Sequence, residues 1–241
     1  MPKAQTASQA TANATGINAA DGSDMVLNSS TIAATATSDS EAGGLTMTLD
    51  ENSQSQSTTT STATANGIAA GAGNNQVINM GAMTTTATSK AKTPDIDLHL
   101  SDTAHADADV KAESTGIGIS GEGSILSQQT GAIAVTATSQ TESGGIDVHL
   151  EDSAKADANT TAYATATGIA GSENKDAITS AVPITVDATS NAYGWIDLES
   201  STDACINATI EANSMAAGMD AGEGDDTITV FSTISSTATA T

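Results

Sequence analysis

The chain of 241 residues contains few of the side chains that build large cores or disulfide frameworks. It has one Phe, one Trp, two Tyr and three Pro, and its single cysteine, Cys205, excludes a disulfide within the chain. Ile, Leu, Val and Phe make up about 15% of the residues, a share that normally indicates disorder when the net charge is high. The chain is therefore either unfolded or folded as thin, stacked β-structure that needs few large side chains.

Positive charge is also scarce. Six Lys and Arg residues stand against 29 Asp and Glu residues, which gives a formal net charge of -23. This imbalance argues against a nucleic-acid partner, because phosphate binding requires Lys and Arg, and against an anionic membrane surface. No apolar run of about 18 residues occurs, so we expect no membrane insertion. Calcium and other divalent cations are natural counter-ions for such a chain, although the charge also serves solubility alone.

Two short motifs recur with a period of about 50 residues. The motif Ala-Thr-Ser begins at Ala36, Ala87, Ala137 and Ala188. The pair Gly-Ile begins at Gly16, Gly67, Gly116 and Gly168, and Gly218-Met219 continues the series. Two independent markers with one period predict a single repeat domain over residues 1–241. The approximate repeats are 1–52, 53–102, 103–152, 153–202 and a partial copy at 203–241.

Alternation of side-chain types predicts several strands in each repeat. Apolar and polar residues alternate strictly over residues 96–100 and 146–150. Over residues 104–116, Ala, Val, Ser and Gly share one face, and Thr, His, Asp, Lys and Glu share the other. Another strand, with Ile133 and Val135, precedes Ala-Thr-Ser. A helical period is absent, and Thr, Ser, Gly and Asn are poor helix formers.

These patterns predict an all-β fold, and the preferred architecture is a β-solenoid of repeats of about 50 residues. The alternative is an antiparallel β-meander or sandwich. Near-identical neighbouring repeats favour the solenoid, because equivalent residues then stack on one another. A sandwich normally needs different strands at its edges and at its centre. Disorder is disfavoured, because a low-complexity sequence would not keep the same alternation in every copy.

A glycine- and acid-rich turn separates Gly-Ile from the Ile/Val strand. In the last repeat it reads Ala-Gly-Glu-Gly-Asp-Asp-Thr-Ile over residues 221–228. It resembles the nonapeptide G-G-x-G-x-D-x-U-x of the RTX calcium-binding β-rolls, with Gly222 and Gly224 at glycine positions and Asp226 at the aspartate position. The resemblance implies a secreted protein in which glycine carbonyls and aspartates bind calcium between stacked turns.

The other copies of this turn match the RTX pattern less well. Asn75 lies at the aspartate position of the second repeat, and the third repeat has no acid there. Asp24 and Asp176 fit only with a shifted residue. The family also repeats its nonapeptides in tandem, whereas this chain has one in about fifty residues. The candidate calcium ligands are Gly222, Gly224, Asp225, Asp226, Asn75, Asp24 and Asp176. The alternative is a solvated turn without a cation.

Other recurring side chains have simple structural explanations beside the functional ones. His99 and His149 occupy equivalent positions, where they could bind a transition metal or face solvent. Asp97 and Asp147 would repel each other if stacked, which favours either a bridging cation or solvation. Cys205 is either a cross-linking residue or an unreactive thiol. No grouping of Ser, Cys and His suggests a catalytic triad, so we expect a protein that is not an enzyme.

The two ends of the sequence suggest a mode of assembly. The chain begins within the long small-residue strand and ends in the Ala-Thr-Ser strand of an unfinished repeat, with no distinct cap. Unpaired strand edges recruit other chains, so we expect head-to-tail self-assembly into an extracellular or cell-surface filament or matrix, with calcium as a stabiliser. The alternatives are a spacer or stalk segment of a large repeat adhesin, and an ice-binding module. The last rests on the threonines at Thr58, Thr60, Thr62 and Thr64.

Overall fold

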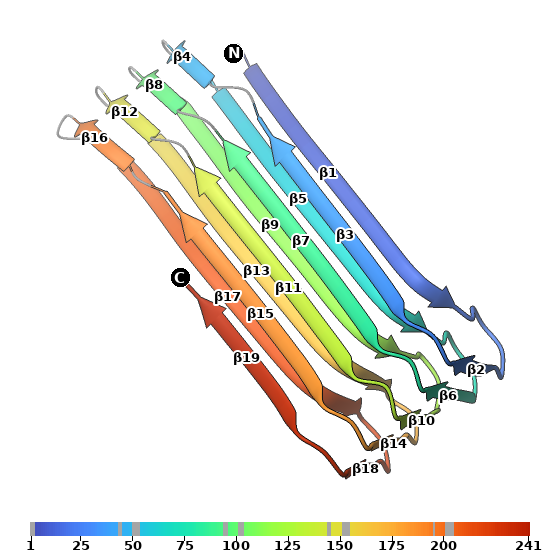
Figure 1. Ribbon diagram of the computed structural model, residues 1–241. Coiled ribbons are helices and arrows are strands. Elements are labelled where there is room, and N and C mark those ends of the chain that lie inside the picture. The colour runs from blue at the N-terminus through green and yellow to red at the C-terminus, as the bar shows by residue number, and fades with distance from the viewer. Residues whose placement is uncertain are drawn as a thin grey trace.

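The computed structural model describes residues 3–42, 45–49, 54–93, 96–100, 104–143, 146–150, 155–194, 196–200 and 205–241. These residues form strands and turns, with no helix among them, and so this part of the chain has no helix able to cross a membrane. In each repeat the chain passes through the same strand positions, and equivalent strands lie side by side in parallel sheets (Figure 1). The all-β β-solenoid is confirmed, and the antiparallel alternative is wrong.

Four parallel sheets result from this winding, and we name them A to D. Sheet A consists of β1 (Lys3–Asn18), β5 (Gln54–Ala69), β9 (His105–Ser120), β13 (Lys155–Ser172) and β17 (Cys205–Gly222). Sheet B consists of β2 (Met25–Asn28), β6 (Asn75–Asn79), β10 (Ile125–Gln129), β14 (Ala177–Ser180) and β18 (Thr227–Val230). Sheet C consists of β3 (Ile32–Glu41), β7 (Met83–Thr93), β11 (Ile133–Ser143), β15 (Ile184–Tyr193) and β19 (Ile234–Ala240). Sheet D consists of β4 (Leu45–Leu49), β8 (Ile96–Leu100), β12 (Ile146–Leu150) and β16 (Ile196–Ser200).

Equivalent residues of neighbouring coils lie in register, so each sequence position forms a column across the molecule. In sheet C, for example, Ala36 pairs with Ala87, and Ala137 pairs with both Ala87 and Ala188. The alternation expected for the long strand is also present. In β9 the buried residues alternate with half-buried ones from His105 to Ile117, with Ala106, Ala108 and Val110 among those turned inward. Each repeat therefore buries its small inner face against its own copies, as the sequence predicts.

The core lies between sheets A and C and changes character along the strands. Next to sheet B it is aliphatic, with fully buried Ile68, Ile119, Ile169 and Ile184. Alanine fills the middle, where Ala63, Ala65, Ala87 and Ala36 pack together. Because alanine is small, the two sheets approach closely, and a chain with few large side chains can still exclude water from its interior.

Buried serine hydroxyls then join sheet A to sheet C. Ser61 Oγ donates to Ser38 Oγ at 2.9 Å, and Ser89 Oγ donates to the carbonyl of Ser61 at 2.7 Å. In the third coil, Ser114 of β9 and Ser139 of β11 make a similar contact from a different column of sheet A, with 2.8 Å between their hydroxyl oxygens. The serines of the Ala-Thr-Ser motifs therefore form a buried column of hydrogen-bonding side chains. A buried hydroxyl is tolerated because it has a partner.

The glycine column of sheet A shows where the sequence marker is wrong. The pairing places Ile119, and not Ile117, between Ile68 and Ile169. The equivalent glycine is therefore Gly118, whereas Gly116 occupies the column of Ala65 and Ala166. A Cβ on Gly118 would lie 2.8 Å from Ile133 Cγ2 and also clash with the carbonyl oxygen of Gly168. The close approach of sheet C requires glycine at this position.

Candidate functional site

The acidic turn forms a column of side chains at the entrance to sheet B. The pairing of β2, β6, β10, β14 and β18 places its members in register. The column consists of Asp24, Asn75, Ile125, Asp176 and Asp226. The structure thus brings together four of the candidate calcium ligands. Asp24 and Asp176 need no shift, because both occupy the same position as Asn75 and Asp226.

The Asp and Asn oxygens of this column bind the backbone of the preceding coil. Oδ1 of Asn75 accepts the N–H of Asp24 at 3.0 Å, and Oδ1 of Asp226 accepts the N–H of Asp176 at 2.8 Å. Asp176 reaches the N–H of Ile125 in the same way, at 2.5 Å. We call this column the Asx ladder. The rungs at Asn75, Asp176 and Asp226 each satisfy a backbone donor at the point where sheet B begins, so the ladder helps to set the register of these turns.

Asp176 is the most enclosed member of the Asx ladder. Its side chain is fully buried, and its second oxygen accepts the N–H of Ser172 at 2.9 Å. Both oxygens of this carboxyl therefore have backbone donors, which is the arrangement that stabilises a buried carboxylate. Asn75 uses its amide differently, because its Nδ2 donates to the carbonyls of Gly71 at 3.1 Å and Gly73 at 3.4 Å.

The remaining candidate ligands border the last rung. Gly222 and Gly224 have φ values of 81° and 138°, a region that favours glycine. Asp225 is exposed, next to the half-buried Asp226. Among the described side chains, no group of three or more His, Cys, Asp or Glu residues is arranged to hold a metal ion. The calcium site stays a prediction. What the geometry establishes is a ladder of carboxyl and amide oxygens that bind backbone N–H groups.

Sequence reasoning missed a second polar column at the other end of sheet B. It contains Asn28, Asn79, Gln129, Ser180 and Val230. Nδ2 of Asn28 donates to Oδ1 of Asn79 at 2.7 Å, and Asn79 is fully buried. Asn28 and Ser180 also bind backbone groups two residues ahead. The signal is present in the sequence as a polar residue four positions after each of the first four Asx-ladder positions.

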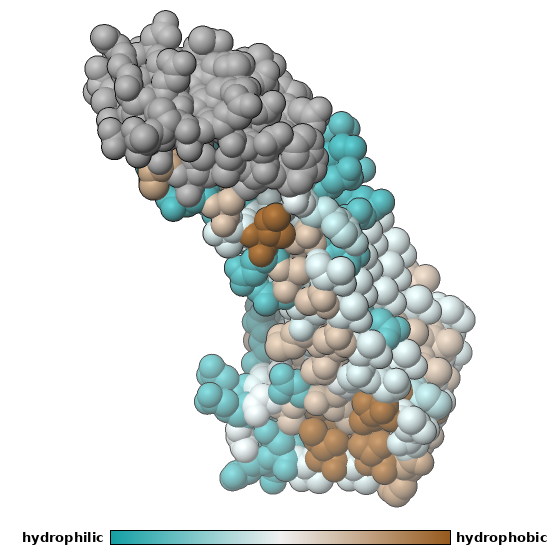
Figure 2. Space-filling model, turned by 90° about the vertical axis from the view of Figure 1, so that its left-hand side faces the viewer, coloured by the Kyte–Doolittle hydropathy of each residue, from teal (hydrophilic) through white to brown (hydrophobic). Residues whose placement is uncertain are grey.

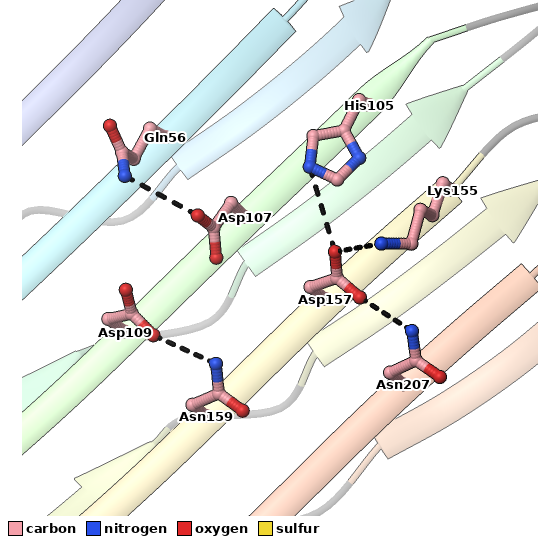
Figure 3. A network of polar contacts seen from close by, with 8 residues as sticks. All are labelled: Gln56, His105, Asp107, Asp109, Lys155, Asp157, Asn159 and Asn207. Carbon is pink, nitrogen blue, oxygen red and sulfur yellow. Dashed lines mark hydrogen bonds and ion pairs between the residues drawn. The ribbon is translucent and has the colours of Figure 1, made fainter.

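The outer face of sheet A carries a network of stacked charges (Figure 3). Lys155 Nζ lies 2.7 Å from Asp157 Oδ2, and Asn207 donates to Asp157 Oδ1 at 2.8 Å. His105, which pairs with Lys155 in the register, lies 3.6 Å from Asp157 Oδ2. Asp107, directly beside Asp157 in the next coil, receives one 3.4 Å hydrogen bond from Gln56. Positive charge is therefore concentrated on one of two stacked aspartates.

The pKa values of the two aspartates are consequently shifted in opposite directions. Burial, followed by the negative charge of Asp109, raises the pKa of Asp107 above its ordinary value. Burial also acts to raise the pKa of Asp157, but the hydrogen bonds from Lys155 and Asn207 outweigh it, and this pKa is lowered. The hydrogen bond to Asp157 raises the pKa of Lys155. Burial and the neighbouring charge of Asp109 thus destabilise the Asp107 carboxylate at neutral pH, and the stacked Asp157 adds to this effect.

Other candidates are placed in part. His99 pairs with His149, and Asp97 with Asp147, in the backbone register of sheet D, but their side chains lie outside the described ones. Cys205 begins β17 with an exposed free thiol.

In comparisons with known proteins, no family model, curated protein or solved structure matches the chain. The class of the protein is therefore defined by its fold alone, a parallel β-solenoid with four strand positions in each full coil.

The first and last coils each leave one edge of every sheet they form without a neighbouring coil. Inward-facing residues are open there. Ile210 is 49% exposed and Ile228 45% exposed, whereas Val110 and Ile178, which lie in the same two columns, are 3% and 1% exposed. Figure 2 looks onto the side of the last coil and shows hydrophobic groups gathered away from the grey residues. This apolar edge is the side of a core that a further coil would cover.

Proposed function

We propose that this chain is a structural protein that assembles head to tail into an extracellular filament or matrix, by stacking the last coil of one copy on the first coil of the next. The observation that carries the proposal is the match between the two edges. The open inner residues Ile228 and Ile234 of the last coil continue columns whose first-coil members are also aliphatic.

The match includes two aliphatic core columns and the Asx ladder. The column that ends in Ile228 begins with Val26, and the one that ends in Ile234 begins with Ile32. The Asx ladder ends in Asp226 and begins with Asp24. Oδ2 of Asp24 is buried and has no hydrogen-bond partner, and every later Asp of the ladder accepts an N–H from the coil before it. The N–H of Asp226 in a preceding copy is the donor that this position requires.

Strand addition of this type is a heterologous contact, so it propagates along one axis and does not close into a dimer. Unpaired edges of parallel sheets offer rows of N–H and C=O groups that a second identical coil can satisfy. The alternative function, a spacer segment of a large repeat adhesin, predicts a rod that stays monomeric. The two functions therefore differ in the concentration dependence of particle length.

The direct test is negative-stain microscopy and sedimentation of the 241-residue chain over a range of concentrations. We expect filaments that are as wide as a single solenoid and that become longer as the protein concentration rises. Ile228→Lys should stop assembly, because the stacked interface would bury its ammonium, and should leave the melting temperature of the monomer nearly unchanged. Leu126→Lys is the matched control, because Leu126 is 41% exposed on the outer face of sheet B in the middle coil. A monomer at every concentration, or filaments from Ile228→Lys, would refute the proposal.

Calcium bound at the Asx ladder is a separate part of the proposal. It is supported by the charge of -23 and by the RTX-like turn at residues 221–228. We expect calcium to raise the unfolding temperature in proportion to the logarithm of its concentration. Asp226→Asn keeps the acceptor for the N–H of Asp176 but removes the charge, so it should keep the fold and reduce the calcium response. An equal response in the variant and the wild type would exclude calcium at this rung.

A further inference from the structure

The outer face of sheet C carries threonine in two adjacent columns. The first column consists of Thr37, Thr88, Thr138, Thr189 and Thr239. The second, two residues earlier in each strand, consists of Thr35, Thr86, Thr136, Asp187 and Thr237. The burial alternation of β3, β7, β11 and β15 places these residues on the face away from the core. Each coil thus presents the pattern Thr-Ala-Thr, with the alanine turned inward and one Asp substitution.

We propose that this threonine face binds ice, or water ordered as in ice. This function is independent of head-to-tail assembly. It also differs in location from the array at residues 58–64, whose equivalents in β9 are charged, with Asp109, Lys111 and Glu113 in register. The ligand class follows from three properties of the face: its regular spacing, its low charge and the unused hydroxyls of its first column.

The spacing forms a two-dimensional lattice. Parallel strands lie about 4.8 Å apart, and residues two apart in a strand about 6.6 Å, so the Thr side chains repeat in both directions. Threonine is branched at Cβ and restricted in χ1, so stacked copies present a hydroxyl and a methyl group in the same orientation. Figure 1 shows the five strands of sheet C straight and side by side. A rigid lattice of this kind suits a ligand that is itself a lattice, whereas a small soluble molecule would contact few of the columns.

Charge is almost absent from this face, although the chain carries -23 overall. A third column, two residues before the second, contains only Ala, Thr and Ser. Asp187 is the one charged residue in the three columns. Charged residues resume beyond the threonines, where Lys90 and Lys92 continue β7. A charged group would lose favourable hydration on contact with a neutral solid surface, so a neutral patch bounded by charges suits an uncharged, hydrogen-bonding surface.

The hydroxyls of the first threonine column are unused. Across the described part of the chain, none of these five hydroxyl groups makes a hydrogen bond with another residue, and the contact of Ser214 with Thr239 is to the backbone carbonyl of Thr239. A hydroxyl is both a donor and an acceptor, so each can enter a water network in either role. The flat face also has no aromatic platform in its threonine columns, which argues against a polysaccharide surface. Ordered water is the ligand that uses both the hydroxyls and the methyl groups.

The test measures thermal hysteresis and ice recrystallisation with the purified chain and pure ice. We expect the wild type to lower the temperature at which ice grows, so that it falls below the melting point. Thr138→Tyr, which breaks the flat face at the central coil, should lose most of this activity. Thr115→Tyr is the matched control on the outer face of sheet A in the same coil, and it should keep the activity. Circular dichroism and the melting temperature check that both variants fold.

A second variant guards against a folding defect. Thr88→Lys lies on a strand that already carries lysine at residues 90 and 92 of the same face, and it should also lose most of the activity. An inactive wild type, or equal losses in Thr138→Tyr and Thr115→Tyr, would overturn the proposal. A change of sedimentation coefficient in Thr138→Tyr but not in Thr115→Tyr would assign the face to contact between copies, and would overturn it as well.

Discussion

The backbone N–H of Asp176 donates a 2.8 Å hydrogen bond to Oδ1 of Asp226, the equivalent residue one coil further along the chain. Sequence neighbours do not make this contact, because fifty residues separate the two. The contact requires stacked coils in one register, since a slip by one residue would turn every side chain of a strand to the opposite face. The Asx ladder therefore couples the local turn to the repeat as a whole.

Removing the most enclosed rung should destabilise the fold. Asp176→Ala deprives the N–H groups of Ile125 and Ser172 of their acceptor inside the protein. Each unsatisfied buried donor costs about 1–3 kcal/mol, so we expect a clear fall in the free energy of unfolding in urea. Asp225→Ala is the control, because Asp225 is exposed, and it should change the stability by less than about 0.5 kcal/mol. Equal effects of the two substitutions would show that the ladder is not structural.

Two glycines in one strand should respond differently to the same substitution. Gly118→Ala places a Cβ 2.8 Å from Ile133 Cγ2 and against the backbone of the next coil. We expect a loss of about 1–3 kcal/mol, as for overpacked cores. Gly116→Ala brings its Cβ only to 3.0 Å from Val135 Cγ1, in a column that already holds alanine in neighbouring coils. Its melting temperature should stay near that of the wild type, and a larger loss for Gly116→Ala would contradict the register.

Neutralising two stacked aspartates should change the stability in opposite directions. Asp107→Asn removes a carboxylate whose pKa is raised by burial and by Asp109, so it should stabilise the protein at pH 7. Asp157→Asn removes the partner of Lys155 and should destabilise it. Both side chains are partly exposed, so each change should be about 1 kcal/mol or less. Thermal unfolding in low salt measures both, and shifts of the same sign would refute the proposed network.

The pH dependence of stability follows from the same two groups. The raised pKa of Asp107 means that its folded state binds a proton more readily than the unfolded chain does, so stability rises as the pH falls through that raised pKa. Asp157, with a lowered pKa, gives stability that is present above the unfolded pKa of its carboxyl and is lost as the pH falls through the folded one. Urea unfolding from pH 7 to pH 3 should show the mild-acid gain in the wild type. Asp107→Asn should show less of it.

In the third coil, Ser127 and Gln129 interrupt the aliphatic and asparagine columns of sheet B, and substitutions can restore both columns. Ser127 is buried between Val77 and Ile178, and its hydroxyl accepts a 2.6 Å hydrogen bond from Gln129. Oε1 of Gln129 is buried without a partner. The double variant Ser127→Val, Gln129→Asn restores the aliphatic and asparagine columns together, and we expect a gain of about 1 kcal/mol in the free energy of unfolding. Ser127→Val alone should gain less, because it leaves the Gln129 amide without its acceptor.

Much of the fold follows from the sequence because repetition makes the evidence redundant. The period, the inward parity of the alanines and the stacking of equivalent residues were all predicted correctly. Two Gly-Ile pairs stand in succession in the third repeat, so the motif alone points to Gly116 as the column marker. Only contact with Ile133 across the core shows that Gly118 is the equivalent residue. The sequence pattern does not separate the short strands of sheet B from the preceding turn, because four or five residues give little alternation.

Site prediction was limited for a different reason. Asp24 and Asp176 looked displaced because the preceding loops differ in sequence, whereas the pairing that aligns them comes from sheet B, after the turn. The threonine face of sheet C was present in every Ala-Thr-Ser strand. It becomes visible only when parity and register are combined, because no single strand carries more than a few threonines on that face.

The stacking of coils can be tested by double electron–electron resonance. The distance is measured between spin labels on cysteines introduced at residues 37 and 239, in a Cys205→Ser background. These positions lie on the same column, four coils apart. Strands spaced by about 4.8 Å place the two backbones about 19 Å apart, with a narrow distribution. A broad distribution, or a mean distance more than about twice that value, would contradict a solenoid of in-register coils.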